Sequence, residues 1–243
     1  MPSENAVNPI NPWGSDLDQM KEWDPTGAAL LERVGTNPFN NGLFTPKEVA
    51  LIYLALVCAC TNLDAQATRR QIRVALDAGA SRDEILLVLK CGAGLAIHTC
   101  SVGAPILLEE AAAAGVRPTA KSAATTPACD QVRAVGQWNN AWDPFLELDP
   151  VWTDEFMATG VSVYGSKLFS AKEVELLSIA FDASYTHMYA PGTRRHIKNA
   201  LKAGATLEEV MEVLKLCVVQ GVQACNLGVP ILAEELAAKA ASR

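Results

Sequence analysis

Apolar residues recur at helical spacing, not strand spacing, along most of the chain. In the segment 67–78, Ile72, Ala75 and Leu76 fall on one face of a helix, with basic residues between them. An earlier helix is predicted to begin at Thr45-Pro46-Lys47-Glu48, which joins an N-cap threonine, a proline and a glutamate three residues after the cap. Since no alternating pattern of useful length is found, the sequence predicts an all-α fold.

This helical pattern occurs twice in the sequence, as an internal repeat. Residues 44–110 align with 169–235 at a fixed offset and without a gap, and roughly 40 % of the aligned positions are identical. A gapless duplication of this kind predicts two copies of one unit, related by a pseudo-two-fold axis, that bury a shared face. The predicted division is an irregular N-terminal arm (1–40), a first repeat (41–114), a linker rich in Pro, Ser, Thr and Ala (115–137) and a second repeat (138–243).

Composition narrows the class of protein. Half of the 243 residues are apolar and 19 % are charged, which is typical of a packed globular protein. A net charge of −7 argues against a nucleic-acid partner. No apolar run reaches the roughly 18 to 20 residues that span a bilayer, so no membrane partner is expected. Seven cysteines, an odd number placed within helical patterns, indicate reduced thiols and a cytoplasmic location.

One segment carries a family signature. RHIKNALKAGATLEEV (195–210) resembles the carboxymuconolactone decarboxylase and alkyl hydroperoxidase D-like superfamily, in which a histidine opens a helix reading H-x-x-x-A-L-x-x-G. The first copy reads QIRVALDAGASRDEI (71–85), with glutamine in place of the histidine. The resemblance implies a helical unit that assembles in rings of dimers. Because a fused pair is equivalent to one dimer, a homotrimer of this chain is expected.

Members of the redox branch of that superfamily resemble one another in a Cys-x-x-Cys-x-x-x-His motif. Its two cysteines lie on adjacent helical turns and can form a disulfide. The two cysteine positions are Tyr189 and Gly192 in the second copy, and Asp64 and Ala67 in the first. A thiol peroxidase is therefore disfavoured. The decarboxylase branch needs neither thiols nor a cofactor. Resemblance to this branch implies that the substrate is a small lactone carboxylate, which basic residues hold. This chain departs from the family at Gly192, four residues before the histidine, where the family often has a glutamate.

The second copy holds the candidate catalytic residues. His196 occupies the reactive position of the family, and imidazole can take and give a proton near neutral pH, which Gln71 cannot. His187, in place of Asn62, is the second candidate. Three isolated histidines without metal-ligand spacing argue against a metal site.

The candidate substrate-binding residues are basic, aromatic or acidic. The paired arginines of each copy suit a carboxylate, because the guanidinium fork is planar. His98, in place of Gln223, is expected to enter the pocket of the first copy. Glu209 is expected either to contact substrate or to anchor an arginine. The full set is Arg69, Arg70, Arg194, Arg195, Tyr185, Tyr189, His98 and Glu209.

The function implied by this resemblance is a cofactor-independent lyase that acts on a small, anionic carboxylated or lactone-like catabolite by histidine acid–base chemistry. A hydrolase or isomerase using the same pocket is the first alternative. A non-catalytic binding or scaffold protein is the second, and these alternatives stay open at the level of sequence.

Overall fold

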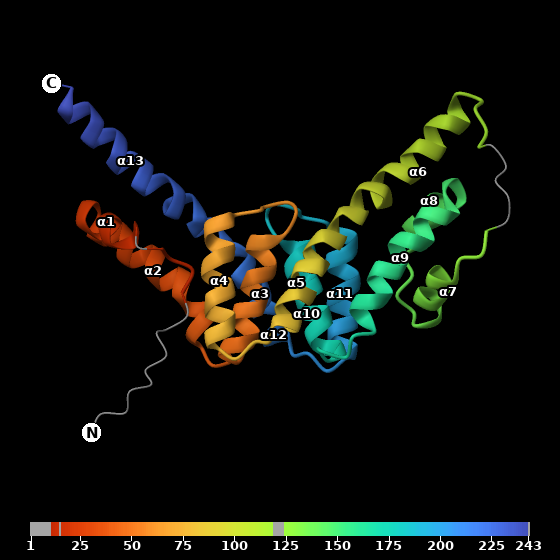
Figure 1. The fold of residues 1–243 in the computed structure, drawn as a ribbon, viewed down its shortest axis with the longest axis horizontal. Helices are drawn as coiled ribbons and strands as arrows, with labels where there is room; N and C mark the ends of the chain where they lie inside the picture. Colours follow the sequence, from red (N-terminus) through yellow and green to blue (C-terminus); the bar gives the residue numbers. More distant parts are fainter. Residues whose placement is uncertain (1–10, 15, 119–123, 243) are drawn as a thin grey trace.

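The computed structural model describes residues 11–14, 16–118 and 124–242, and within these residues it contains helices and no strand (Figure 1). The predicted all-α fold is confirmed. Short 3₁₀ turns lie at Leu95–Ile97, Asn140–Trp142 and Gln220–Val222. The α-helices are α1 (Asp16–Trp23), α2 (Pro25–Asn40), α3 (Pro46–Cys58), α4 (Ala65–Asp77), α5 (Arg82–Gly94), α6 (His98–Ala113), α7 (Pro127–Ala134), α8 (Asp143–Leu148), α9 (Pro150–Tyr164), α10 (Ala171–Ala183), α11 (Ala190–Lys202), α12 (Leu207–Val219) and α13 (Gln223–Ala241).

The helices of the two copies begin and end at matching positions. Each boundary of α3, α4 and α5 recurs 125 residues later in α10, α11 and α12. Equivalent residues also meet each other: the hydroxyls of Thr61 and Thr186, which are 125 positions apart, lie 3.1 Å apart. A contact between equivalent residues is what a two-fold relation between the copies requires.

Capping residues explain why these helices start where they do. The Thr45 hydroxyl accepts from the backbone N–H of Glu48, whose carboxylate accepts from the backbone N–H of Thr45. Ser170 and Glu173 form the same reciprocal box at the start of α10. These boxes satisfy donors that the helix itself leaves unpaired, so the predicted starts of α3 and α10 are confirmed.

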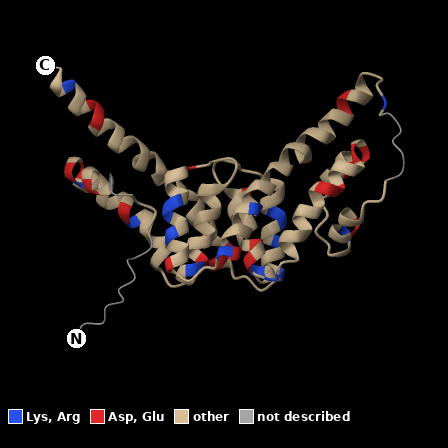
Figure 2. Ribbon diagram, viewed as in Figure 1, with Lys and Arg blue, Asp and Glu red and all other residues tan. Residues whose placement is uncertain are grey.

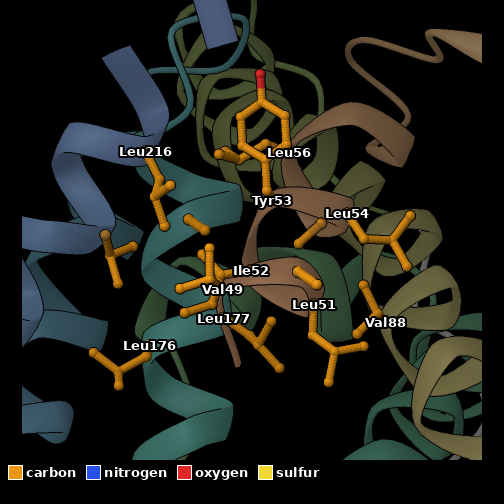
Figure 3. Packing of buried hydrophobic residues seen from close by; sticks show 14 of the residues in the cluster. Val49, Leu51, Ile52, Tyr53, Leu54, Leu56, Val88, Leu176, Leu177 and Leu216 are labelled. Carbon is orange, nitrogen blue, oxygen red and sulfur yellow. The ribbon is translucent and has the colours of Figure 1, made fainter. Parts of the chain in front are cut away.

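The core lies between α3 and α10 at the centre of the molecule. Nearly every residue of α3 from Val49 to Val57 is buried, because neighbouring helices cover it on all sides. Leu176 and Leu177 of α10 and Leu216 of α12 face the same cluster as Leu51 and Ile52 (Figure 3). This shared core makes the two copies one body.

The N-terminal arm is not irregular over the residues described, which corrects the prediction. Asp24 caps α2 through the backbone N–H of Gly27, Pro25 occupies the first helical position, and Phe39 is buried. The high content of proline and asparagine led to the prediction of an irregular arm, although Asp24 and Pro25 serve here to start a helix. The linker also contains α7, because Pro127 starts a helix whose Val132 packs into a second apolar cluster with Trp142 and Phe145.

Two long helical runs extend beyond the core. Arg82–Ala113 and Leu207–Ala241 are long and apolar enough to cross a membrane by length and composition, so the expectation that no run reaches that length is wrong. Each run continues from one α-helix into the next through a 3₁₀ turn. Within the most apolar window of each run, 44 % and 39 % of the residues are buried inside the protein, so more than half of each window is not. Their outer halves, α6 and α13, project from the central bundle and carry few charged residues (Figures 1 and 2).

Candidate active site

A cavity of about 620 Å³ lies where the first copy meets the second. The end of α5 and the start of α6 form one wall, α10 and α11 form another, and α7 and α9 close it. Most of the lining is apolar, so charges inside are poorly screened by solvent. The principal apolar side chains are Val132, Trp142, Phe156, Met157, Val161, Val163 and Phe181.

His196 lies at this cavity and is held by partners on both sides of its ring. Its Nδ1 is 2.6 Å from Oε2 of Glu175 on α10, and its Nε2 is 3.0 Å from Nη2 of Arg195. Because an arginine can only donate, Nε2 accepts, and the proton of the neutral ring belongs on Nδ1, where it is donated to Glu175. Gln137 Nε2, at 3.0 Å, donates to the other oxygen of Glu175. The tautomer of His196 is therefore fixed by its partners.

The electrostatic surroundings keep His196 neutral. Burial lowers its pKa, the hydrogen bond to Glu175 opposes that shift, and the positive charge of Arg195 lowers the pKa further. A neutral imidazole in this environment acts as a base before it acts as an acid.

Asp182 lies between two imidazoles. Its Oδ2 is 3.6 Å from His196 Nε2, its Oδ1 is 3.7 Å from His98 Nδ1, and Oδ2 has no hydrogen-bond partner among the described residues. Burial raises the pKa of Asp182 to about 7, against the opposing charge of Arg195. A carboxyl group in this state can hold or release a proton at neutral pH.

His98 and His187 lie on the side of Asp182 opposite to His196. His98 Nδ1 and His187 Nε2 are 2.7 Å apart, the ring centroids are 4.9 Å apart and the planes differ by 16°, so the rings meet nitrogen to nitrogen, edge to edge. Tyr189 stacks on His98 with a centroid distance of 3.8 Å. Burial, followed by the charges of His187 and Arg195, lowers the pKa of His98 to about 3. Burial also lowers the pKa of half-buried His187.

This placement corrects the expectation that His98 enters the pocket of the first copy. The 3₁₀ turn at Leu95–Ile97 directs α6 across the interface, and His98 reaches Asp182 of the second copy instead. The pocket therefore combines a residue from the first repeat with catalytic candidates from the second.

The spacing of the histidines in the sequence did not reveal that potential metal ligands lie close together in the fold. His98, Asp182 and His187 each offer a ligand atom, and the three atoms lie within 4.8 Å of one another. Two nitrogens bound to one tetrahedral zinc would be about 3.3 Å apart, given zinc–nitrogen distances of about 2.0–2.1 Å. The 2.7 Å separation of the two histidine nitrogens is shorter, and it matches a direct hydrogen bond.

The equivalent region of the first copy is filled. Tyr53, at the position of Ser178, is fully buried, and its hydroxyl accepts from Gln223 Nε2 at 2.9 Å. Gln223 also accepts from Nη2 of Arg70 at 3.0 Å, and Phe39 packs against the tyrosine ring edge to face. Gln71, at the position of His196, is buried beneath this layer. Large side chains occupy the space that remains open in the second copy.

Other predicted residues lie outside the cavity. Arg69, Arg194 and Tyr185 are exposed and do not line it, because their positions fall on the solvent side of α4 and α11 or in the turn before α11. Arg70 is engaged with Gln223 in the filled region. Glu209 belongs to the capping box of α12 and pairs with Lys172 at 2.7 Å, so it anchors neither substrate nor arginine.

Glu175 and Asp182 are site residues that were not predicted from the sequence. Both lie on the inner face of α10, where the first copy has Ala50 and Val57. An acidic residue at an apolar position of a repeat, found in one copy alone, was the signal available for both.

Gly192 is explained by Asp182. A Cβ atom at Gly192 would overlap the Asp182 carboxyl group and come within 2.7 Å of the Tyr189 ring. A side chain larger than glycine at this position of α11 would therefore displace the Asp182 carboxyl group.

The thiols are poorly suited to redox chemistry. Cys91 lines the cavity, and burial raises the pKa of its thiol to about 11. Burial raises the pKa of Cys58 to about 12. A nucleophilic thiol needs a lowered pKa. The charge of Lys90 lowers the pKa of Cys91, but burial outweighs that effect.

The chain is similar to a protein of known structure. It is similar to the crystal structure of a putative gamma-carboxymuconolactone decarboxylase subunit from Burkholderia xenovorans LB400, with 33 % sequence identity and a TM-score of 0.84. The similarity covers 93 % of this chain and 92 % of that chain. No protein-family model matches the chain, and no curated protein does so either. Identity and coverage of this extent establish that the chain belongs to the carboxymuconolactone decarboxylase-like superfamily.

Proposed function

We propose that the chain is a cofactor-independent lyase that acts on a small carboxylated or lactone-like compound in the cavity beside His196. The observation that carries this proposal is Arg195. Its guanidinium lines an apolar cavity, and no carboxylate of the described residues lies within ion-pair distance of it. A positive charge without a carboxylate in direct contact favours an anionic ligand in such surroundings.

The size and lining of the cavity suit a compact ligand with an apolar body. A volume of about 620 Å³ falls in the range of small-molecule sites, which are mostly apolar with a few polar groups that fix orientation. Trp142 presents its ring to Arg195, with the guanidinium carbon 5.3 Å from the ring centroid. The Trp142 indole is itself fixed by donating to Ser101 at 2.9 Å.

The reaction proposed is decarboxylation by proton transfer. The carbon–carbon bond to the substrate carboxylate breaks, carbon dioxide leaves, and the electron pair passes into the conjugated lactone carbonyl. Asp182, protonated at pH values below about 7, then gives its proton to carbon. His196 then takes up a proton from solvent at Nε2 and returns it to Asp182, whose Oδ2 lies 3.6 Å from that nitrogen.

The open pocket of the second copy supports an active protein over a scaffold. A buried carboxyl oxygen without a partner and an unpaired guanidinium both cost stability. In the first copy, Tyr53 is packed and hydrogen-bonded, whereas Gln71 is buried with an unpaired Oε1. Asp182 and Arg195 are ionisable as well as buried and incompletely paired, and such groups are expected where function requires them.

We further propose that the chain assembles with copies of itself through α6 and α13, as a trimer. The outer parts of both helices expose matching apolar residues at equivalent positions, a surface that association would bury. These residues are Val102, Ile106 and Leu107 on α6, and Leu227, Ile231 and Leu232 on α13.

Incubation of the purified protein with carboxylated muconolactones tests the activity. Release of carbon dioxide and the structure of the product, followed by NMR, should show decarboxylation that His196→Gln abolishes and Arg194→Gln preserves. Formation of a rearranged lactone or of its open-chain acid without loss of carbon dioxide would instead assign an isomerase or a hydrolase. No turnover of any such compound would refute the proposed function.

A further inference from the structure

The base that the proposed function needs is blocked in the structure. His196 gives its Nδ1 proton to Glu175 at 2.6 Å, so Nε2 carries the basic lone pair of the neutral ring. That lone pair accepts from Arg195 Nη2 at 3.0 Å. No proton can reach Nε2 while the guanidinium occupies it.

The guanidinium is poorly satisfied in this position. Arg195 Nε and Nη1 are buried without a hydrogen-bond partner among the described residues. Its other contact is the face of Trp142, which imposes no single hydrogen-bonding arrangement. A hydrogen bond from arginine to a neutral imidazole is weaker than a paired, charge-assisted bond to a carboxylate. Arg195 therefore has more to gain from an anion than it loses by leaving His196.

We propose that Arg195 is an anion-operated cap on His196: the carboxylate of the ligand draws the guanidinium away from Nε2 and thereby frees the base. The inference rests on the proposed function and names the regulation of that same site. Arg195 is a positioning residue here as well as a ligand-binding residue. Neutral compounds of the same shape would enter the cavity without freeing the base.

The groups around His196 favour this change once an anion has bound. Glu175 on α10 stays bonded to Nδ1 and stabilises a positive ring. Asp182 on α10 lies 3.6 Å from Nε2 with an oxygen that has no partner, so it can bond Nε2 when Arg195 has moved. His98 on α6 contacts Asp182 from the other side, and its low pKa keeps it neutral. Two carboxyl groups and a bound anion then face the imidazole.

NMR of protein labelled with ¹⁵N in histidine can test the cap without an enzyme assay. The probe is benzoate, a flat monocarboxylate, and the neutral control is benzamide. Benzoate should raise the pKa of His196 by about one unit or more, because a cation is withdrawn from Nε2 and an anion is added. Benzamide should leave that pKa unchanged.

Variants separate the cap from general ligand binding. Arg195→Ala should show a raised His196 pKa without benzoate, no further rise with benzoate, and benzoate affinity at least about tenfold lower. Arg194→Ala, at the exposed neighbouring position, should behave as wild type. If Arg195→Ala does not fold, Arg195→Lys should still bind benzoate while the His196 pKa starts closer to its ordinary value.

The failures are distinguishable. If benzoate shifts the Trp142 indole signal but leaves the His196 pKa unchanged in wild type, the cap is wrong and the proposed function stands. If benzoate produces no shift at Trp142 or at His196, the cavity does not take carboxylates, and both proposals are overturned.

Discussion

His98 and His187 share a hydrogen bond of 2.7 Å although they are 89 positions apart and belong to different repeats. The bond joins the start of α6 to the turn between α10 and α11. Neither repeat could build this pocket alone, because each contributes one imidazole to the same pair. The site therefore depends on residues from both repeats.

His196→Gln should lower turnover by a hundredfold or more, since it removes the group that exchanges a proton while glutamine can still donate to Glu175. Steady-state kinetics on a carboxylated lactone would measure the effect. Gln71→Ala, at the equivalent position of the first copy, should leave turnover per folded molecule near that of wild type. Equal losses in both variants would contradict the assignment to the second copy.

The stability of the protein should depend on pH through Asp182. Its folded pKa, about 7, is raised from 3.8, so the native state holds this proton more tightly than the unfolded state does. The stabilisation from the protonated form is complete below about pH 4 and is lost as the pH rises through about 7. Relative to wild type, Asp182→Asn should therefore gain up to about 4 kcal/mol in free energy of unfolding over this range.

Urea unfolding at several pH values would measure this difference. His98 contributes with the opposite sign, because its pKa is lowered to about 3 and its stabilisation is lost as the pH falls below about 6.5. Both wild type and Asp182→Asn contain His98, so much of its contribution cancels in the difference between their free energies of unfolding. A difference that does not change between pH 4 and 7 would show that Asp182 titrates normally.

Gly192→Ala should destabilise the protein by about 1–3 kcal/mol, the usual cost of overpacking, because the added methyl overlaps the Asp182 carboxyl group. Asp182→Ala in the same chain should recover part of the loss, since it removes the overlapping atoms. A double-mutant cycle from thermal unfolding measures this coupling. Strictly additive effects of the two substitutions would refute the steric explanation.

Replacement of Cys91 by alanine should change turnover by no more than about twofold. Its thiol lines the cavity, but burial raises its pKa to about 11, so the reactive thiolate is scarce at neutral pH. Peroxide reduction by wild type that disappears in the variant would reverse this conclusion. Cys129→Ala, buried away from the cavity, is the matched control for packing.

Assembly can be tested by light scattering after size exclusion. Wild type should have a mass near 78 kDa, three times the 25.9 kDa chain. Ile106→Asp combined with Ile231→Asp should yield smaller species, because each places a charge in an apolar face. A monomeric wild type would refute the trimer.

The fold was predictable because its signals are local and repeated. Capping boxes at Thr45 and Ser170 fixed helix starts, and the duplication fixed their order. The helices at the N-terminus and in the linker escaped prediction because proline there marks first helical positions as well as breaks, as at Pro25 and Pro127.

The candidate site was only partly predictable. His196 stood out by its position in the family signature, whereas its partners Glu175 and Asp182 come from another helix. Their roles depend on burial and on distances of a few ångströms, which residue spacing does not encode. The arginines show the same limit: Arg194 and Arg195 are adjacent in sequence, but only Arg195 lines the cavity.

The filled region around Tyr53 has a consequence for how such a chain can change. In a symmetric dimer of separate chains, every substitution appears at both pockets, so a side chain that plugs one pocket plugs the other. Fusion removes that restraint. One half is free to accumulate packing such as the Tyr53–Gln223 bond, and the surplus stability allows the other half to keep a destabilising site.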